Sequence, residues 1–294
     1  MKKVVTRIKG GLGNQMFCYA AARRLALVRG AELVIDDISG FGRDHLYRRH
    51  YGLHHFRVAG RKATARERLQ PFARYRRGVW KWWAGRKPFL ERRYLEQEGR
   101  DFDPRLLAVE VNGTLYLDGY WQSENYFKDV EQIIRADLQI IPPTDTCNRR
   151  MAERILDCVA VALHVRWFDP PGSSAGHNVS AAYYKRAVAV IETMSESPHY
   201  FVFSDNPEEA REKLTLPLNR VTFVSHNGGE DSAYADLWLM TQCQHFITAN
   251  STFSWWGAWL GCRAGKIVVT TALTVDGETA WGFKGLIPDE WVRV

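Results

Sequence analysis

The sequence predicts an α/β protein with two domains, each built on a parallel β-sheet. Short apolar runs alternate with helical segments along most of the 294 residues, which is the pattern of doubly wound sheets. The length suits two domains of moderate size. Paired prolines at 142–143 mark a linker, because they stop helices and favour extended chain. We therefore expect an N-terminal domain over 1–143 and a C-terminal domain over 144–294.

The N-terminal half opens with a strand–helix–strand unit. Its predicted elements are a strand at 4–8, a helix at 15–29 and a strand at 32–36. Further along, the sequence predicts a strand at 115–118 and a helix at 124–138.

The C-terminal half alternates more regularly. The run 159–165 is continuously apolar, as expected for a strand buried on both faces. Further strands are predicted at 200–203, 221–224, 245–248 and 266–270, and helices at 182–194, 207–214, 234–240 and 253–260. In parallel sheets of this kind, ligands bind beyond the carboxyl ends of the strands. We therefore expect functional residues directly after the strands.

Positive charge is concentrated between residues 57 and 100. This segment holds fourteen Lys and Arg against four Glu, a net of +10, in a chain whose formal charge is +7. Tryptophans and other aromatics are interleaved with the cations. We interpret the segment first as a solvated helical hairpin whose aromatics form its core face, and second as a contact to an anionic membrane surface. Nucleic acid is not an expected partner.

The composition also indicates in which cellular compartment the protein is expected. No apolar run reaches the length of a membrane span, and the N-terminus is too quickly charged for a signal peptide. The five cysteines are odd in number and lack CxxC spacing, which argues against a disulfide framework and a zinc site. We expect a cytoplasmic protein, with a peripheral position on the inner membrane face as an option.

Two of the post-strand turns are rich in glycine or charge. The loop after the first strand contains Gly11, Gly13, Asn14 and Gln15; glycines let the backbone approach a ligand, and amides can bind sugar hydroxyls. Its spacing is neither GxGxxG nor a P-loop. The most apolar strand ends in His164, Arg166 and Asp169, and an arginine there can grip a phosphate bidentately. The alternative is that Arg166 only pairs with Asp169.

Two further turns are rich in hydroxyls and amides. One contains Ser204 and Asp205, for which helix capping is the alternative interpretation. The other is a strand-to-helix turn whose donors can satisfy a diphosphate; its members are Asn250, Ser251, Thr252, Phe253 and Ser254. The nearest approach to a metal-binding DxD is the Asp101–Asp103 turn, so we expect no metal and no cofactor, with diphosphate charge balanced by Arg166 and helix dipoles.

Several of these segments resemble the α-1,2-fucosyltransferases of glycosyltransferase family 11. The segments, which span nearly the whole chain, are GGLGNQMF at 10–17, GYWQS at 119–123, HxRxxD at 164–169, VFSD at 202–205, and DLxLM at 236–240 continuing to ANSTFSWWGAW at 249–259. The resemblance implies a GT-B-like fold: two Rossmann-like parallel-sheet domains with the active site in the cleft between them. It also implies GDP-fucose as donor, a β-galactoside oligosaccharide or lipid-linked glycan as acceptor, inversion at the fucose carbon, and a bacterial source.

Roles follow from the resemblance and the chemistry of inversion. Asp169 is the first candidate for the base, with Glu124 and His177 as alternatives. Arg166 and the 250–254 turn would stabilise the leaving GDP, and Asn14 would lie near the reacting carbon. The nucleobase and ribose would contact Ser204, Asp205 and the chain around His164.

One position departs from the family pattern. The family usually has a second arginine where this chain has Trp167, which puts the choice of acceptor in question rather than the donor.

Two other functions are alternatives to this interpretation. One is a fucosyltransferase of another linkage, such as the α-1,6 or O-fucosyl type. The other is a non-catalytic basic module that binds membrane or nucleic acid.

Overall fold

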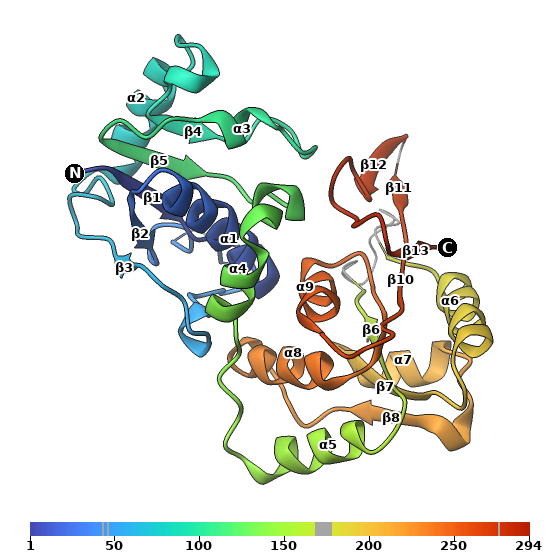
Figure 1. The fold of residues 1–294 in the computed structure, drawn as a ribbon. Coiled ribbons are helices and arrows are strands. Elements are labelled where there is room, and N and C mark those ends of the chain that lie inside the picture. Colours follow the sequence, from blue (N-terminus) through green and yellow to red (C-terminus); the bar gives the residue numbers. More distant parts are fainter. Residues whose placement is uncertain (43, 46, 168–177, 276) are drawn as a thin grey trace. The chain divides into compact units, whose positions relative to one another are not determined.

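The computed structural model describes residues 1–42, 44–45, 47–167, 178–275 and 277–294. The chain forms two compact units (Figure 1): unit 1 contains Met1–Ile141 and Lys284–Leu286, and unit 2 contains Pro142–Phe283 and Ile287–Val294. The sequence assigned every residue from 144 onward to the C-terminal domain. That assignment is wrong for Lys284–Leu286, where the backbone of Lys284 bonds to that of Phe102 in unit 1.

Unit 1 is built on a five-stranded parallel sheet of order β3-β2-β1-β5-β4. Its strands are β1 (Lys3–Arg7), β2 (Glu32–Asp36), β3 (Arg61–Lys62), β4 (Tyr94–Glu96) and β5 (Thr114–Asp118). Its helices are α1 (Leu12–Val28), α2 (Ala73–Ala84), α3 (Arg105–Ala108) and α4 (Glu131–Asp137). Short 3₁₀ turns are η1 (Leu53–His55), η2 (Phe89–Glu91), η3 (Glu124–Tyr126) and η4 (Lys128–Val130). The predicted strands at 4–8, 32–36 and 115–118 are confirmed.

Two predictions for unit 1 are wrong. The helix expected at 124–138 is divided into η3, η4 and α4, because Phe127, between η3 and η4, and Val130, at the start of α4, have φ values of −146° and −125°, outside the helical range. The basic segment is not a helical hairpin: it supplies both edge strands, β3 and β4, and a single long helix, α2. Strands of two or three residues are too short to show a periodic pattern, and charged side chains are common on sheet edges.

Unit 2 is built on a six-stranded parallel sheet of order β13-β10-β9-β6-β7-β8. Its strands are β6 (Ala160–Val165), β7 (His199–Ser204), β8 (Val221–Val224), β9 (His245–Ile247), β10 (Val268–Thr270) and β13 (Val292–Arg293). Its helices are α5 (Thr146–Leu156), α6 (Ala181–Met194), α7 (Pro207–Lys213), α8 (Ala233–Gln242) and α9 (Thr252–Leu260). The 3₁₀ turns η5 (Leu218–Arg220) and η6 (Glu230–Ser232) and an antiparallel pair, β11 (Leu273–Val275) and β12 (Glu278–Trp281), complete it. All predicted elements of this half are confirmed; α5, β11, β12 and β13 were not predicted.

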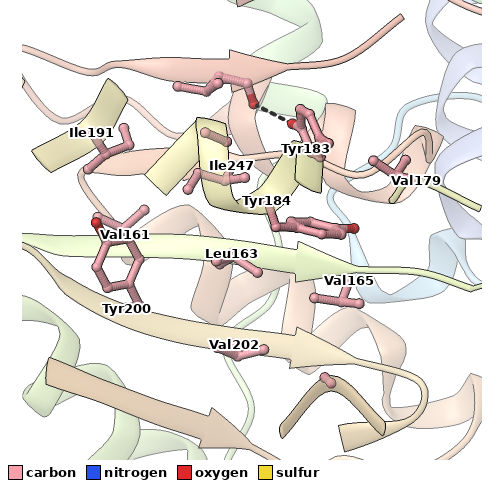
Figure 2. Packing of buried hydrophobic residues seen from close by; sticks show 13 residues of the cluster. Val161, Leu163, Val165, Val179, Tyr183, Tyr184, Ile191, Tyr200, Val202 and Ile247 are labelled. Atoms are coloured by element: carbon pink, nitrogen blue, oxygen red, sulfur yellow. Dashed lines mark hydrogen bonds between the residues drawn. The ribbon is translucent and has the colours of Figure 1, made fainter. Parts of the chain in front are cut away.

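In the core of unit 2, helix α6 packs against the sheet and forms hydrogen bonds near the carboxyl ends of the strands (Figure 2). Every residue of β6 is buried, as its apolar sequence predicts, and its alternate side chains pack with Tyr183, Tyr184 and Ile191 of α6. The Tyr183 hydroxyl donates to the carbonyls of Thr248, at 2.7 Å, and Val269, at 3.4 Å. The Tyr184 hydroxyl donates to the His164 carbonyl at 3.2 Å. Buried hydrogen bonds of this kind hold the strand ends in place.

Gly40 allows the loop after β2 to lie against the backbone at the end of β1. A Cβ at this position would lie 1.9 Å from the Ile8 carbonyl oxygen, an impossible contact, whereas a Cβ at Gly42 would meet nothing within 4 Å. We expect Gly40→Ala to lower the free energy of unfolding by about 1–3 kcal/mol through overpacking. Gly42→Ala is the matched control and should be neutral or slightly stabilising. Urea unfolding of both variants tests this; equal stabilities would contradict the close approach.

Candidate active site

Polar residues follow three neighbouring strands of unit 2, as the sequence predicted. They come after β7, β6 and β9, which are adjacent in the sheet. Because the strands are parallel, their carboxyl ends share one edge. This edge is the candidate site of unit 2.

Arg166 and Asp205 form an ion pair at this edge. The register of β6 and β7 sets Val165 opposite Ser204, so the next residues of both strands emerge side by side. The Arg166 Nη1 lies 3.1 Å from the Asp205 Oδ2. Desolvation raises the pKa of the Asp205 carboxyl, while the charge of Arg166 acts in the opposite direction. Asp169, the partner considered from the sequence, lies outside the described residues. The arginine is 27% exposed and so remains accessible to an anion.

His164 is buried next to this ion pair and carries an unsatisfied nitrogen. Its Nδ1 has no hydrogen-bond partner among the described residues, and its ring lies 5.4 Å from that of Phe253. Burial, followed by the charge of Arg166, lowers the pKa of His164 to about 3. The imidazole is therefore neutral at pH 7 and keeps one nitrogen as an acceptor. A buried polar atom without a partner costs about 1–3 kcal/mol, so a ligand that satisfies it gains binding energy.

The turn before α9 combines helix capping with an anion-binding helix end. The Ser251 Oγ accepts a hydrogen bond from the Phe253 N–H at 3.3 Å, so this residue is the N-cap. The Ser254 Oγ is fully buried and donates to the backbone carbonyl of Ser251 at 3.2 Å. The expectation that Ser254 contacts the donor is therefore not favoured by its position. Asn250, Thr252 and Phe253 are partly exposed at the N-terminal end of the helix, where the backbone dipoles favour an anion.

A second polar cluster at α5 and α8 was missed by the sequence analysis. Asn148 of α5 and Asn227 of the loop after β8 bond to each other at 2.9 Å, and Asn227 donates to the Asp236 Oδ1 of α8 at 2.8 Å. His226 Nε2 lies 3.1 Å from the Asn148 Oδ1. Burial raises the pKa of Asp236 to about 7, although the bond from Asn227 acts against this. Of these residues, only Asp236 belongs to a motif noted in the sequence, DLxLM at 236–240. Asn148 and Asn227 are single asparagines far apart in the chain, so neither periodicity nor spacing marks them as functional.

Unit 1 presents its own polar edge, and Asn14 is part of it. The Asn14 Oδ1 accepts from the Gln122 Nε2 at 2.7 Å, which joins the glycine loop to the segment after β5. Gly10 has a φ of +77°, and a Cβ there would lie 3.0 Å from the Asn14 Nδ2. The glycine is therefore required for this packing.

The other residues of the glycine loop are structural. Gln15 is buried; its Nε2 donates to the carbonyls of Gly10 and His50, and its Oε1 accepts from the Gly52 N–H. These bonds use the amide to hold two loops together, so the expected role of Gln15 in donor binding is not favoured. Gly11 is the N-cap of α1, and Gly13 is buried in its first turn.

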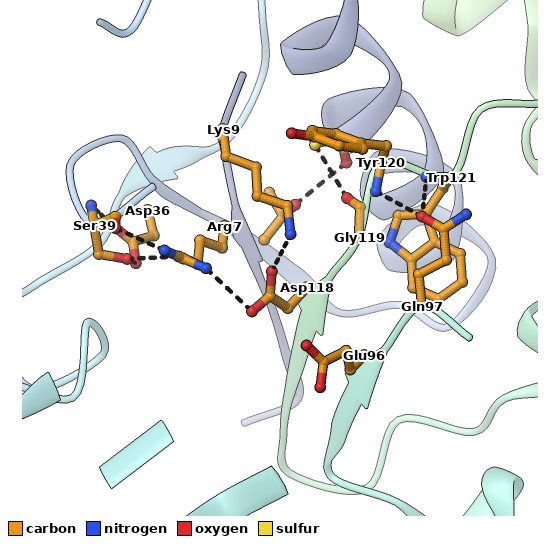
Figure 3. A network of polar contacts seen from close by, with 12 residues as sticks. Arg7, Lys9, Asp36, Ser39, Glu96, Gln97, Asp118, Gly119, Tyr120 and Trp121 are labelled. Atoms are coloured by element: carbon orange, nitrogen blue, oxygen red, sulfur yellow. Dashed lines mark hydrogen bonds and ion pairs between the residues drawn. The ribbon is translucent and has the colours of Figure 1, made fainter. Parts of the chain in front are cut away.

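The carboxyl ends of β1, β2 and β5 form a charged network (Figure 3). The buried Asp118 pairs with Lys9 at 2.7 Å and Arg7 at 3.3 Å, and accepts from the Tyr94 hydroxyl at 2.7 Å. Burial alone would raise the pKa of Asp118, but Lys9 and Arg7 lower it to about 2. The carboxylate is therefore ionised at any physiological pH and fixes both cations in place.

Trp121, next to this network, has a left-handed backbone. Its φ is +56°, which is uncommon for a bulky residue and marks stored strain. The Gln97 Oε1 accepts from the N–H groups of Tyr120 and Trp121 at 2.8 and 3.0 Å, which holds the conformation (Figure 3). The strained turn directs the following Gln122 to Asn14.

Only one of the three candidate bases is described by the structure. Glu124 begins η3, is 7% exposed and forms an ion pair with Lys128 at 3.0 Å. Asp169 and His177 lie outside the described residues. In the Asp101–Asp103 turn both carboxylates bond to groups of the chain itself, Lys284 N and Arg105. Within the described ranges no cluster of metal-ligating side chains is found, and no helix is long and apolar enough to cross a membrane.

The raised pKa of Asp236 predicts a pH-dependent stability. The folded state holds this proton up to about pH 7, whereas the unfolded chain releases it near the ordinary carboxyl pKa of 3.8. Folded molecules therefore bind more protons over this window, and stability falls as pH rises through it. We expect Asp236→Asn to remove a loss of about 4 kcal/mol between these limits.

Urea unfolding across the same pH range measures this difference. Asp157→Asn, an exposed position at the end of α5, is the matched control and should keep the wild-type profile. Parallel profiles for wild type and Asp236→Asn would contradict the raised pKa.

Comparisons with known proteins now identify the family. The sequence model of "Glycosyl transferase family 11" matches residues 77–292. Over 100% of its length the chain is 25% identical to an "Alpha-1,2-colitosyltransferase" of Escherichia coli, covering 99% of that protein. Over 98% of its length it is 28% identical to the "O-antigen biosynthesis glycosyltransferase WbnK" of Escherichia coli, again covering 99% of it.

Two further similarities extend this result. Over 46% of the chain, human "Galactoside alpha-(1,2)-fucosyltransferase 1" is 31% identical, with 38% of that protein covered. Among solved structures, Arabidopsis thaliana FUT1 in complex with GDP superposes with a TM-score of 0.57 at 15% identity, over 94% of this chain and 71% of that one. The structural likeness confirms the GT-B-like fold with two Rossmann-like domains. With a family model matched over most of its length, this chain belongs to glycosyltransferase family 11.

Proposed function

We propose that this glycosyltransferase moves L-fucose from GDP-β-L-fucose to the 2-hydroxyl of a terminal β-galactoside, forming Fucα1-2Gal. The observation that carries the proposal is the position of Arg166, at the shared strand edge of unit 2 and two residues after His164, whose ring lies 5.4 Å from that of Phe253 at the N-terminal end of α9. An arginine and a helix N-terminus together suit a diphosphate. Family membership and the α-1,2-fucosyltransferase relative support the fucosyl group and the linkage.

The remaining groups of this edge suit the nucleoside. His164 is neutral, and its buried Nδ1 has no partner among the described residues and lies beside the Phe253 ring. Such a pair matches a nucleobase, which presents both hydrogen-bonding edges and a flat face. Ser204 and Asp205 lie at the end of the adjacent strand, where a ribose hydroxyl would find an acceptor. In this proposal Arg166 divides its contacts between Asp205 and the phosphate.

The chemistry is a direct displacement. A base removes the proton of the galactose 2-hydroxyl while its oxygen bonds to the fucose anomeric carbon, and the bond from that carbon to the diphosphate oxygen breaks. GDP leaves with the bonding electrons, and its charge is stabilised by Arg166 and the 250–254 turn. Asp169 is the proposed base, with Glu124 and His177 as alternatives. Because Glu124 is bound to Lys128, it would have to exchange a partner to accept a proton.

The relatives raise a second candidate donor. Colitose is L-fucose without its 3-hydroxyl, and the Escherichia coli α-1,2-colitosyltransferase aligns along the full chain. A donor site that hydrogen-bonds the 3-hydroxyl would reject the deoxy sugar strongly, whereas a site that leaves it in water would accept both. We propose fucose as the donor and the acceptor as a free or lipid-linked glycan. Other linkages are separated by analysis of the product.

Arg166→Ala tests the donor site. We expect turnover of GDP-fucose to fall by at least about a thousandfold, because the developing charge on GDP loses its cation. Asp205→Asn removes the ion pair but keeps the arginine, and should cost far less. GDP release, measured beside thermal unfolding of each variant, is the readout. Near-normal turnover of folded Arg166→Ala would remove this residue from the mechanism.

A donor and acceptor panel in EDTA tests the reaction itself. We expect galactoside-dependent release of GDP from GDP-fucose without added metal, because Arg166 and the helix end balance the diphosphate charge. GDP-colitose in the same assay identifies which sugar is preferred. A strict metal requirement would overturn the metal-free account, and GDP binding without transfer to any galactoside would favour a non-catalytic module.

A further inference from the structure

The long helix of the basic segment, α2, carries two different stripes of side chains. Arg74, Arg77 and Lys81 recur at intervals of three and four residues and therefore share one side of the helix. A second stripe contains Phe72, Tyr75, Val79, Trp82 and Trp83, again at helical spacing. The helix rests on the sheet through other positions, among them Trp80, whose ring meets that of Tyr116 edge-on at 5.3 Å.

The cationic stripe lines a cavity of about 480 Å³, here called the α2 cavity. Its lining residues are Arg7, Ser39, Gly40, Gly42, Arg74, Arg77, Gly78 and Lys81. Asp118 already holds Arg7, and Lys81 pairs with Glu96. Among the described residues, by contrast, no carboxylate lies within ion-pair distance of Arg74 or Arg77. The cavity therefore has an excess of positive charge and room for a phosphate group.

The aromatic stripe faces solvent. Phe72 is 80% exposed, Tyr75 74%, Trp82 53% and Trp83 58%. Large aromatics are usually buried on average, and a continuous exposed stripe of them marks an interaction surface. The Arg86 guanidinium lies over the Trp82 ring at 3.2 Å from its centroid, so a cation flanks the stripe.

We propose that α2 binds the surface of an anionic lipid bilayer, with its aromatic stripe at headgroup depth and a lipid phosphate in the α2 cavity. Tryptophan and tyrosine favour the membrane interface because their rings are apolar and their N–H or O–H groups are polar. A basic amphipathic helix lies in the plane of that interface. This inference goes beyond the proposed function and does not depend on it.

The arrangement favours a bilayer over nucleic acid. Binding of a single strand stacks successive bases on separate aromatic faces along a charged groove. Here Trp82 and Trp83 instead pack edge-to-face against each other at 4.9 Å, and Arg86 covers one ring. Two indoles packed in this way present their edges and a flanking cation, which suits the headgroup region of a bilayer better than a stack of bases.

Vesicle flotation with the full-length chain tests the proposal. We expect binding to phosphatidylcholine vesicles that contain phosphatidylglycerol, weaker binding at high salt, and little binding to phosphatidylcholine alone. Arg74→Gln combined with Arg77→Gln should weaken partitioning by roughly thirtyfold, since each cation near such a surface contributes about fivefold. Trp82→Ala combined with Trp83→Ala should weaken it comparably at low and high salt.

The matched control is Arg66→Gln combined with Lys87→Gln. Both residues are exposed, belong to the same basic segment and lie outside the α2 cavity, so the change in net charge is the same. An equal loss in both double variants would overturn the phosphate site, and wild-type binding in the cavity variant would do so as well. Displacement of the protein from vesicles by RNA at equal phosphate concentration would overturn the bilayer as the partner.

A soluble galactoside assay separates this inference from the proposed function. GDP release on the soluble acceptor should be unchanged in the cavity variant, since Arg74 and Arg77 have no part in the transfer. Loss of vesicle binding with unchanged turnover would support the proposal. A parallel loss of turnover on the soluble acceptor would overturn the assignment of these arginines to a membrane contact.

Discussion

The complete burial of β6 is the constraint on which the candidate site depends. A strand covered on both faces can carry polar groups only where it ends, so Arg166 emerges at the sheet edge and His164 remains just inside it. The parallel register then decides the neighbours: Val165 lies opposite Ser204, which brings Asp205 to Arg166. Desolvation of His164 follows from the same burial and keeps its ring neutral. One packing requirement thus sets the position and partner of Arg166 and the protonation state of His164.

In unit 1, a buried carboxylate at the end of β5 is neutralised by cations from the segment that begins with β1. Asp118 is nearly inaccessible, and an unpaired carboxylate there would be costly. Lys9 and Arg7 compensate it and are immobilised in return. Lys81 of α2 also lies within 3.8 Å of this carboxylate, whereas Arg74 and Arg77 have no carboxylate within ion-pair distance among the described residues. Arg7 belongs both to the buried network and to the lining of the α2 cavity.

The sequence predicted the strands and helices of the C-terminal half well because apolar runs alternate there regularly with helical segments. It failed where a side chain's role depends on partners distant in the chain. Gln15 and Ser254 have the same functional groups as a ligand-binding amide and hydroxyl, yet their bonds go to the backbones of His50 and Ser251. Strands β3 and β4 have two and three residues, too few for a pattern to show. Likewise, the Arg166–Asp205 pair depends on register, which no local pattern specifies.

Trp167 shows why a departure from the family pattern need not reach the donor. The indole packs against the core of unit 2, its N–H donates to the Val179 carbonyl at 3.4 Å, and Lys213 lies over its ring at 5.1 Å. The Trp167 side chain is uncharged and packs against the core, so it cannot pair with a phosphate. The substitution of the usual second arginine therefore moves a cation out of the site and leaves a structural anchor between the end of β6 and the start of α6. Under the proposed function, Arg166 would balance the diphosphate with helix dipoles rather than with a neighbouring arginine, so the N-terminal end of α9 would carry more of that role.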